Sequence, residues 1–478
     1  MKLLAALLSF CCLASIHATP LPESVRQELK KANIPQSGIA VEVLEVGRSA
    51  PLISINAQQA MNPASTMKLL TTFAALDLLG PAYSWKTEAW IDGELEDGVL
   101  HGDLILKGYG DPKFTIEQFW LWLSELRSRG LREIRGDLVL DRSYFDLPAH
   151  DPAQFDADPA RAYNVGPDAL LINFNTLRLR YMPDGNSLKV ISEPALDGVT
   201  VNNRLIPKGD KVNCDDWDDY FSVQPTGDSV LLQGDYPIVC GEREQNLSVM
   251  PHTRYVGALF GAVWKELGGT LQGKERDGSV GEKAKLFSTH RSDPLSLIIR
   301  DINKYSNNVM ARQLFLTLGS AGPAMGEVAS STAGFNSHPL NIERSIFIMQ
   351  AWLARNQMNF KEVALENGAG LSRKERISAA HMARLLQHAY SHPLSAEFQA
   401  SLPILGVDGS IKRRLQDSPA ASHAHLKTGT LEGVKAIAGY VRSQSGKELI
   451  VVFYINHRNA KQGQDAQDAL IEWLARRK

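Results

Sequence analysis

The spacing of three short motifs constrains this chain more than any other feature of its sequence. Ser65-Thr66-Met67-Lys68 pairs a hydroxyl with an amine, Ser306-Asn307-Asn308 adds a hydroxyl and amides, and Lys427-Thr428-Gly429-Thr430 adds a second amine. The first two motifs begin 241 residues apart, whereas the third begins 121 residues after the second. If the motifs meet at one site, most of the first interval must fold as separate structure.

The first motif has a physical rationale on a helix. Asn62-Pro63-Ala64 is typical of a helix start, and residues 67–76 are good helix formers with a periodic apolar face. Residues three apart share a helix face, so the amine of Lys68 can take the proton of the Ser65 hydroxyl. The helix N-terminus favours negative charge on the Ser65 oxygen, and burial near other cations lowers the pKa of Lys68. The spacing predicts an activated serine.

Each motif also has an ordinary structural explanation when it stands alone. Serine and lysine are common, so a Ser-x-x-Lys match arises by chance in many chains of this length. Ser306-Asn307-Asn308 is typical of a helix cap or a turn, and Lys427-Thr428-Gly429-Thr430 is typical of a charged edge strand. The ordered set of three is much harder to explain in this way.

In this order the motifs resemble those of the penicillin-recognising serine acyltransferases, the superfamily of penicillin-binding proteins and serine β-lactamases. Further stretches resemble one branch, the D-alanyl-D-alanine carboxypeptidase/endopeptidase family of class C penicillin-binding proteins, the penicillin-binding protein 4 type. These stretches are Gly108–Pro112, Gly136–Asp141, Asn367–Arg373 and Leu402–Ser410. The resemblance therefore runs from end to end of the chain.

The resemblance implies a role for the residues that form the acyl-enzyme. Ser65 attacks the carbonyl of a D-Ala-D-Ala bond while Lys68 takes its proton. The backbone N–H groups of Ser65 and Thr430 donate to the oxyanion of the tetrahedral intermediate. Asn308 holds Lys68 and the substrate amide in place.

The resemblance also implies how the leaving side of the substrate is bound. Ser306 and Lys427 relay a proton to the departing amine, and Lys427 and Thr428 bind the terminal carboxylate. Gly429 lets the substrate backbone approach the strand. Water then hydrolyses the acyl-enzyme.

The resemblance implies an α+β fold, namely a penicillin-binding-protein/β-lactamase-like transpeptidase domain with an antiparallel sheet flanked by helices. A large, mainly β insertion of one or two small accessory domains is expected between the first two motifs, at about residues 87–285. Residues 19–86 and 286–478 then form a split catalytic domain. A chain of 478 residues, 44% hydrophobic and 22% charged, has the length and composition of several globular domains.

Local apolar patterns predict the approximate positions of individual helices and strands. In the insertion we expect strands near residues 100–106, 133–140, 169–181 and 187–191, and a helix near residues 115–129. Helical patterns over residues 251–267 and 294–318 put Ser306 at or near a helix interruption. A hairpin over residues 434–456 and a final amphipathic helix complete the pattern.

The first 18 residues are typical of a secretory signal peptide. Lys2 gives a positive start, residues 3–15 are apolar, and Ile16-His17-Ala18 offers a cleavage site. The apolar run is shorter than the roughly 20 residues that span a bilayer, which favours cleavage over a retained anchor. No stable membrane span is then expected after cleavage, and with the resemblance the expected location is a Gram-negative periplasm.

Only Cys214 and Cys240 remain after such cleavage. An even pair in an exported protein predicts one disulfide, whereas two buried free thiols are the alternative. No Cys or His spacing resembles a metal site, and we expect no cofactor. The nearly balanced charge gives no reason to expect a nucleic acid partner. The partners implied are peptidoglycan stem peptides and β-lactams that acylate the enzyme.

Several charged residues have no motif that assigns them a catalytic role. Asp408 and Glu432 flank the motifs, but we expect each to be structural or solvated, and neither supports the water activation that a β-lactamase needs. Asp111 and Asp141 lie in turn-like stretches and are expected to cap or brace the insertion. Residues 151–158 and Arg161 could contact the stem peptide, but no motif assigns them.

Two other functions stay open from the sequence. The same fold and nucleophile could serve an esterase or an aminopeptidase, although the intact Lys427-Thr428-Gly429 argues against both. A non-catalytic cell-wall binding protein with a relict site is the other alternative, although every motif residue is present.

Overall fold

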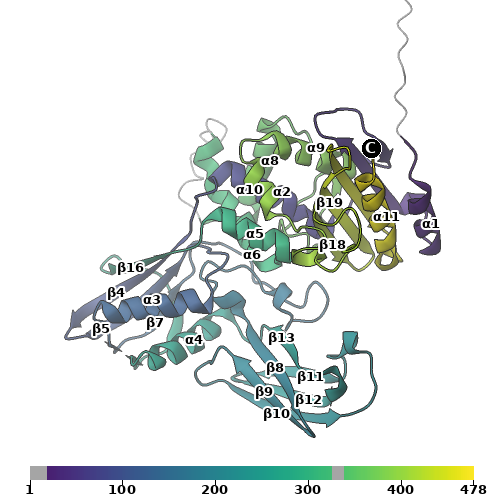
Figure 1. Cartoon of the computed structure of the whole chain (residues 1–478). Helices are drawn as coiled ribbons and strands as arrows, with labels where there is room; N and C mark the ends of the chain where they lie inside the picture. Colours follow the sequence, from purple (N-terminus) through teal and green to yellow (C-terminus); the bar gives the residue numbers. More distant parts are fainter. Residues whose placement is uncertain (1–18, 326–338) are drawn as a thin grey trace, which may run out of the picture.

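The computed structural model describes residues 19–325 and 339–478. The predicted signal peptide, residues 1–18, therefore lies outside the described residues. Figure 1 shows a part that carries the three motifs and, below it, a part made by the chain between the first two motifs. Within the described ranges, no helix has both the length and the apolar character needed to cross a membrane.

The part that carries the motifs is built on an antiparallel sheet with the strand order β18-β19-β20-β1-β2 in the described chain. The strands are β1 (Ile39–Glu45), β2 (Ile53–Ile55), β18 (Ala424–Leu431), β19 (Val434–Arg442) and β20 (Glu448–Asn456). Strand β20 is buried on both faces along most of its length, which explains its continuous apolar run. Because β1 pairs with β20, segments from opposite ends of the chain form one sheet.

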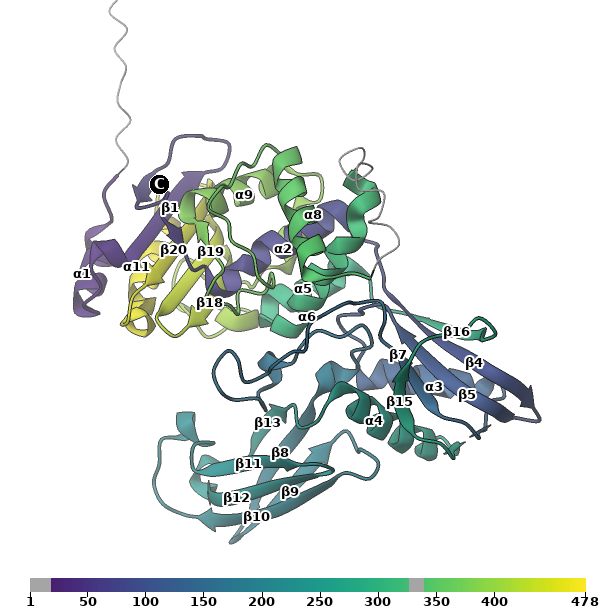
Figure 2. The same cartoon turned by 180° about the vertical axis from the view of Figure 1, so that it is seen from behind.

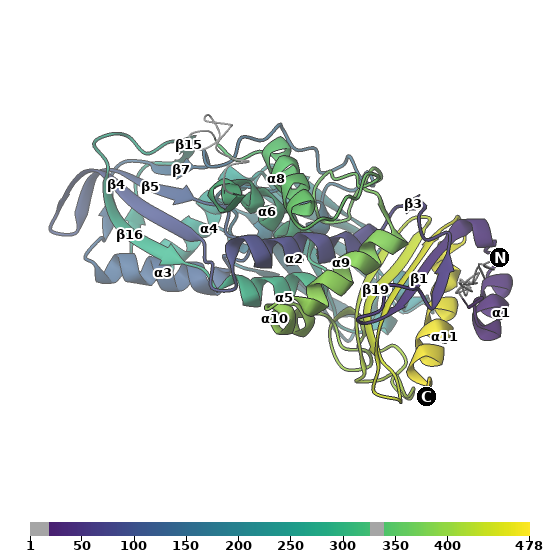
Figure 3. The same cartoon turned by 90° about the horizontal axis from the view of Figure 1, so that it is seen from above.

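Helices cover both faces of this sheet, as Figure 3 shows from above. Helices α1 (Glu23–Lys31) and α11 (Gln464–Ala475) pack on one face. The other face carries α2 (Met67–Leu79), α5 (Leu295–Tyr305), α6 (Asn308–Leu318), α8 (Ile342–Arg355), α9 (Ala379–Ser391) and α10 (Ser395–Ser401). The predicted α+β class, with an antiparallel sheet flanked by helices, is confirmed.

The chain between the first two motifs forms a larger and a smaller unit, seen from behind in Figure 2. The larger unit is a sheet of β4 (Lys86–Glu96), β5 (Val99–Gly108), β6 (Glu133–Ile134), β7 (Leu138–Asp141), β14 (Thr270–Leu271), β15 (Glu275–Gly278) and β16 (Lys285–Arg291), with α3 (Ile116–Ser128) and α4 (His252–Glu266). Strands β4 and β16 pair, with Lys86 opposite Arg291, so the chain enters and leaves this unit side by side. The domain boundaries in the sequence remain a prediction.

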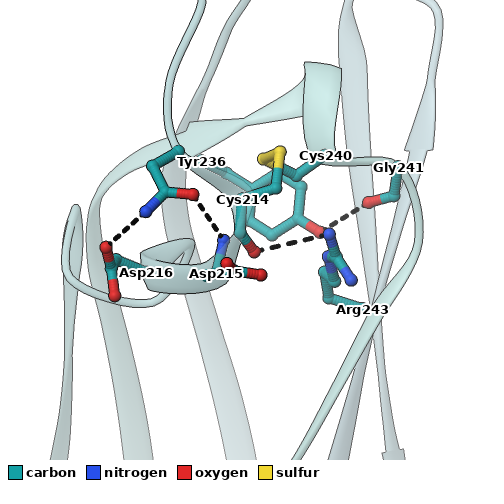
Figure 4. The surroundings of a disulfide bond; sticks show 8 residues. Cys214, Asp215, Asp216, Tyr236, Cys240, Gly241 and Arg243 are labelled. Carbon is teal, nitrogen blue, oxygen red and sulfur yellow. Dashed lines mark hydrogen bonds between the residues drawn. A yellow bond between two sulfur atoms is a disulfide. The ribbon is translucent and has the colours of Figure 1, made fainter. Parts of the chain in front are cut away.

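The smaller unit consists of strands β8–β13 in separate sheets with the orders β10-β12-β11 and β13-β8-β9. The strands are β8 (Leu177–Asp184), β9 (Ser187–Glu193), β10 (Thr200–Lys208), β11 (Phe221–Thr226), β12 (Ser229–Pro237) and β13 (Arg243–Leu247). A disulfide joins Cys214 to Cys240 at one end of this unit (Figure 4). A hydrogen bond also stabilises this end: the Tyr236 hydroxyl donates to the Gly241 carbonyl at 2.8 Å.

Removing this disulfide is expected to loosen the smaller unit alone. The bond closes a loop with a sequence separation of 26, for which the chain-entropy argument gives about 3 kcal/mol. A double Cys214→Ser, Cys240→Ser variant should lose amide hydrogen-exchange protection in β8–β13 but keep its rate of reaction with benzylpenicillin. Loss of that reaction would show that the smaller unit supports the site directly.

Two strand predictions in the insertion are wrong in detail. The strand expected over residues 169–181 begins only at Leu177, because Asn173, Phe174 and Asn175 all have left-handed backbone angles, with φ of 47°, 55° and 52°. Asparagine tolerates this conformation, and the Asn173 amide donates to the Tyr255 hydroxyl at 2.9 Å. The strand expected over residues 133–140 is divided into β6 and β7.

Helix α6 is one of the elements that contact the inserted part. The side chain of Gln313 exchanges hydrogen bonds with the backbone of Asp168, accepting from its N–H at 3.0 Å and donating to its carbonyl at 2.7 Å. Arg312 donates to the Val165 carbonyl at 3.1 Å. Because α6 begins at Asn308, these contacts fix the second motif against the insertion.

Candidate active site

Ser65 lies in a tight turn that leads directly into α2. The turn is a 3-10 helix over Ala64–Thr66, so the serine precedes the α-helix by less than one turn. Ala64 has a left-handed φ of 45°, and its N–H donates to the side-chain oxygen of Asn62 at 2.9 Å. The Asn62 amide donates in turn to the Ser372 carbonyl at 2.8 Å. The turn that carries Ser65 is therefore held by hydrogen bonds to distant segments.

Lys68 is fully buried and contacts Ser65 as the spacing predicts. Its Nζ lies 3.0 Å from Ser65 Oγ and 2.6 Å from Asn308 Oδ1, and it also donates to the Ala369 carbonyl. Burial, followed by the charge of Lys427, holds the pKa of Lys68 well below its usual value. A neutral amine has two N–H donors and one lone pair. With its donors directed at Asn308 and Ala369, the lone pair can accept the Ser65 proton.

Ser306 lies at a break between two helices. Helix α5 ends at Tyr305, Ser306 adopts a left-handed conformation with φ of 58°, and α6 begins at Asn308. The side chain of Asn307 caps α6 by accepting from the Met310 N–H at 3.0 Å. The second motif therefore combines a helix cap, which is its ordinary structural role, with the Asn308 contact to Lys68.

Lys427 is the second buried amine of the site. It is fully buried in β18, and its Nζ donates to Ser306 Oγ at 2.8 Å and to the Thr428 carbonyl at 2.7 Å. Burial lowers its pKa to about 7. The geometry therefore joins Ser65, Lys68 and Asn308 in one group and Ser306 and Lys427 in another.

Strand β18 runs against the turn that carries Ser65. A Cβ atom added to Gly429 would lie 2.7 Å from the Ser65 backbone nitrogen, so this glycine permits close approach of the strand to the Ser65 turn. This reason differs from the sequence expectation, which assigned Gly429 to the approach of substrate. Thr428 Oγ1 lies 3.1 Å from Ser410 Oγ, and Thr430 is exposed. The hydroxyls of Thr428 and Ser410 thus form a polar wall beside Lys427.

Sequence reasoning missed three groups around the motifs. The Ala369 carbonyl, the Ser410 hydroxyl and the Glu375 carboxylate were given no role. Ala369 and Ser410 lie in stretches that marked the family resemblance, which was the available signal. A backbone carbonyl has no side-chain signature, so only its position against Lys68 identifies it.

The charged residues beside the motifs are engaged elsewhere. Asp408 pairs with Lys304 at 2.6 Å and accepts from the Ile404 N–H at 2.8 Å, which makes it a loop brace. The Glu432 side chain is 90% exposed and pairs with Arg373 at 3.3 Å. Both fit the structural or solvated roles expected of them.

Two acidic residues of the inserted part, Asp111 and Asp141, also brace turns. Asp111 accepts from the Lys113 N–H at 2.9 Å, and burial raises the pKa of Asp111 to about 7. Asp141 accepts from the backbone N–H groups of Ser143 and Val280 at 3.0 Å and 2.9 Å. These contacts agree with the expected bracing roles.

Two cavities lie between the inserted part and the part that carries the motifs. One of about 340 Å³ lies between the loop that carries Asp151 and the loop that carries Arg373. Another of about 880 Å³ borders Ser306–Asn308 and is lined across from them by residues of the insertion. Arg161 does not line either cavity and pairs with Asp158 at 2.6 Å.

Residues 21–477 match the D-Ala-D-Ala carboxypeptidase 3 (S13) family, which is nearly the whole chain. The chain belongs to this family. Members of the S13 family are serine-type peptidases, and the arrangement of Ser65 and Lys68 suits that class. The predicted penicillin-binding protein 4 type of carboxypeptidase is confirmed.

Individual relatives agree with the S13 assignment. The D-alanyl-D-alanine carboxypeptidase of an Actinomadura species is 26% identical over 99% of this chain and 88% of its own. The D-alanyl-D-alanine carboxypeptidase DacB of Haemophilus influenzae is 23% identical over 88% of this chain and 85% of its own. The crystal structure of penicillin-binding protein 4 from H. influenzae has a TM-score of 0.73, with 23% identity, and covers 95% of this chain and 99% of that one. The predicted penicillin-binding fold is confirmed by this match.

Proposed function

We propose that this S13 chain is an exported serine D,D-peptidase of peptidoglycan. It cleaves D-Ala-D-Ala as a carboxypeptidase, and D-Ala-meso-diaminopimelate cross-links as an endopeptidase, through an acyl-enzyme on Ser65. The observation that carries the proposal is the contact of the buried Lys68 amine, whose pKa is lowered by burial, with Ser65 Oγ at 3.0 Å. Asn308 supports it by holding that amine at 2.6 Å.

Acylation begins when Lys68 takes the Ser65 proton and Ser65 Oγ attacks the D-Ala carbonyl carbon. The Ser65 and Thr430 N–H groups are proposed to stabilise the oxyanion, where loss of one donor typically costs about 3 kcal/mol. The C–N bond then breaks. The leaving amine receives a proton through Ser306, whose hydroxyl contacts Lys427 at 2.8 Å. Water hydrolyses the resulting ester and regenerates Ser65.

The substrate carboxylate is proposed to bind at the wall formed by Lys427, Thr428 and Ser410. Lys427 supplies positive charge, and the hydroxyls of Thr428 and Ser410, 3.1 Å apart, supply donors. This requirement for a free carboxylate distinguishes the proposed peptidase from an esterase or an aminopeptidase.

Release of D-Ala tests the proposal directly. The purified mature protein should release D-Ala from an N-acylated Lys-D-Ala-D-Ala tripeptide, and it should cleave a cross-linked muropeptide dimer. Hydrolysis of a p-nitrophenyl ester or an L-amino-acid p-nitroanilide without D-Ala release would favour the esterase or aminopeptidase alternative. No turnover and no reaction with any β-lactam would favour the binding protein with a relict site.

The pH dependence follows from the two amines. Lys68 must be neutral to act as a base, and burial together with the charge of Lys427 lowers its pKa, which favours the neutral form. Lys427 must be charged to attract the carboxylate, and its pKa of about 7 means that this charge is lost as the pH rises through that value. We therefore expect kcat/KM for the tripeptide to fall above about pH 7. A substrate ending in D-alaninamide should lack this fall, and a flat tripeptide profile up to alkaline pH would contradict the role of Lys427.

Endopeptidase activity needs room beyond the scissile bond, and the cavity of about 880 Å³ beside Ser306 offers it. Tyr305 lines this cavity and is 71% exposed. Tyr305→Ala should raise KM for the muropeptide dimer several-fold, because an aromatic contact contributes about 1 kcal/mol, and leave the tripeptide unaffected. Tyr220→Ala, which removes an exposed tyrosine of the smaller unit, is the matched control. Equal effects on the dimer and the tripeptide would mean that the second peptide of the dimer binds elsewhere.

We also propose that β-lactams acylate Ser65 and are released slowly. Supporting this, the penicillin-binding protein 4 of H. influenzae has been crystallised in complex with a β-lactam. The carboxylates that flank the motifs, Asp408 and Glu432, are engaged by Lys304 and Arg373, so neither is placed to activate water. Rapid, multiple-turnover hydrolysis of benzylpenicillin would contradict slow release.

Export to a periplasm is proposed from the residues that resemble a signal peptide and from the cell-wall substrate. The Cys214–Cys240 disulfide supports it, because disulfides persist in oxidising compartments. N-terminal sequencing of protein from the periplasmic fraction should begin near Thr19. An unprocessed N-terminus in that fraction would favour a retained anchor.

A further inference from the structure

A buried carboxylate, Glu375, lies behind the loop that contacts Lys68. The side chain has no solvent exposure, and it precedes β17 (Ile377–Ser378), which pairs with β3 (Ala60–Met61) just before the Ser65 turn. Across the described ranges, Glu375 takes part in no ion pair. A buried acid without a cationic partner needs other donors to compensate its charge.

The donors come from the backbone of one loop. Oε1 of Glu375 accepts from the N–H groups of Glu366, Asn367 and Gly368 at 3.2 Å, 3.0 Å and 2.8 Å. Oε2 accepts from the Gly370 N–H at 2.9 Å. Burial raises the pKa of the Glu375 carboxyl, and these N–H groups oppose that rise because they favour the ionised form.

The carbonyl side of the same loop faces α2. The Gly368 carbonyl accepts from Thr71 Oγ1 at 2.6 Å, and the Ala369 carbonyl accepts from Lys68 Nζ. Gly370 has a left-handed φ of 78°, and a Cβ there would lie 1.9 Å from the Ala64 carbonyl oxygen. The loop is thus held between Glu375 on one side and α2 on the other, with no space to shift toward the nucleophile turn.

We propose that Glu375 is a positioning residue for acylation, because it anchors the loop whose Ala369 carbonyl orients the amine of Lys68 toward Ser65. The inference rests on the proposed function of that site. Without the anchor, the Ala369 carbonyl can move away from Nζ, and the lone pair of the amine is no longer aimed at the Ser65 hydroxyl.

The carboxylate also acts through its charge. The charged groups that face Lys68 are Lys427 from β18, Arg312 from α6 and Glu375 from the loop. The two cations lower the pKa of Lys68, whereas Glu375 raises it. Removing the negative charge therefore lowers the pKa of Lys68 further, so the base becomes neutral at lower pH. This displaces the acid limb of the pH–rate profile to lower pH, which a purely structural residue would not do.

The test is the second-order rate of acylation by a fluorescent penicillin, followed across pH from about 5 to 9. Glu375→Gln replaces one accepting oxygen by an NH₂ group, which cannot accept hydrogen bonds from the N–H groups of the loop. We expect its plateau rate to fall about tenfold or more and its acid limb to move to lower pH. Glu375→Asp keeps the charge but is one methylene shorter, so its plateau should fall without displacement of the acid limb.

Glu362→Gln is the matched control. Glu362 also accepts a backbone N–H, that of Ser378 at 3.0 Å, and it contacts His381 rather than the Lys68 loop. Its loss should lower the melting temperature without changing acylation. Acylation at the wild-type rate in folded Glu375→Gln or Glu375→Asp would overturn the inference. It would also be overturned if Glu362→Gln lost acylation in the same proportion to its drop in melting temperature, because the loss would then reflect stability alone. Failure of the wild-type protein to acylate would instead overturn the proposed function.

Discussion

Replacing Ser65 by alanine is expected to abolish the covalent adduct with benzylpenicillin and to reduce D-Ala release at least about a thousandfold. In the proposed mechanism the hydroxyl oxygen forms the acyl bond, and the Lys68 amine contacts it at 3.0 Å. The change removes one atom from a partly buried turn, so the fold should be retained. Intact-mass spectrometry with and without benzylpenicillin, followed by peptide mapping of the adduct, provides the measurement.

Ser410→Ala is the control for this experiment. It removes a different hydroxyl from the same site, the one 3.1 Å from Thr428 Oγ1, and leaves Ser65 intact. The adduct should still form, although more slowly because a donor to the carboxylate is lost. An adduct that persists in Ser65→Ala would mean that another residue is the nucleophile. The mechanism proposed above would then be wrong.

Lys68→Met is expected to have the second largest effect. Methionine fills a similar volume in the fully buried position but cannot accept the Ser65 proton. General-base catalysis contributes roughly 10²–10⁴-fold, so the acylation rate should fall by about that factor. Because the variant lacks the proposed base, raising the pH should not restore the rate. Stopped-flow measurement of acylation against pH tests both statements.

The corresponding control is Lys107→Met, which removes a largely buried lysine of β5. Lys107 pairs with Asp141 at 3.0 Å in the inserted part, so its loss should affect stability and leave acylation unchanged. Acylation of Lys68→Met at the wild-type rate would show that Lys68 is not the base. The Lys427–Ser306 pair, 2.8 Å apart, would then be the alternative proton acceptor.

The contacts and elements that the sequence predicted correctly are those for which local spacing carries the information. Ser65 and Lys68 are three residues apart on a helical segment, so their contact follows from helix geometry. An interruption at or near Ser306 was likewise expected within the helical pattern of residues 294–318, and in the structure α5 ends at Tyr305 and α6 begins at Asn308. Apolar alternation also gave the hairpin of β19 and β20.

The strand expected over residues 169–181 shows where local pattern failed. Its apolar residues suit a strand, but Asn173, Phe174 and Asn175 turn left-handed to meet tertiary partners such as the Tyr255 hydroxyl. Hydrogen bonds to a distant helix outweighed local β propensity there.

The sequence by itself determined the family and the proposed chemistry of this protein, because the three motifs carry the proposed nucleophile, its base and the second amine. Only the tertiary structure decided how they are held. The Ala369 carbonyl and the Glu375 carboxylate lie about 300 residues beyond Lys68 in the chain, yet one contacts its amine and the other anchors that contact. Such long-range hydrogen bonds depend on how segments pack, and no local spacing in the sequence encodes them.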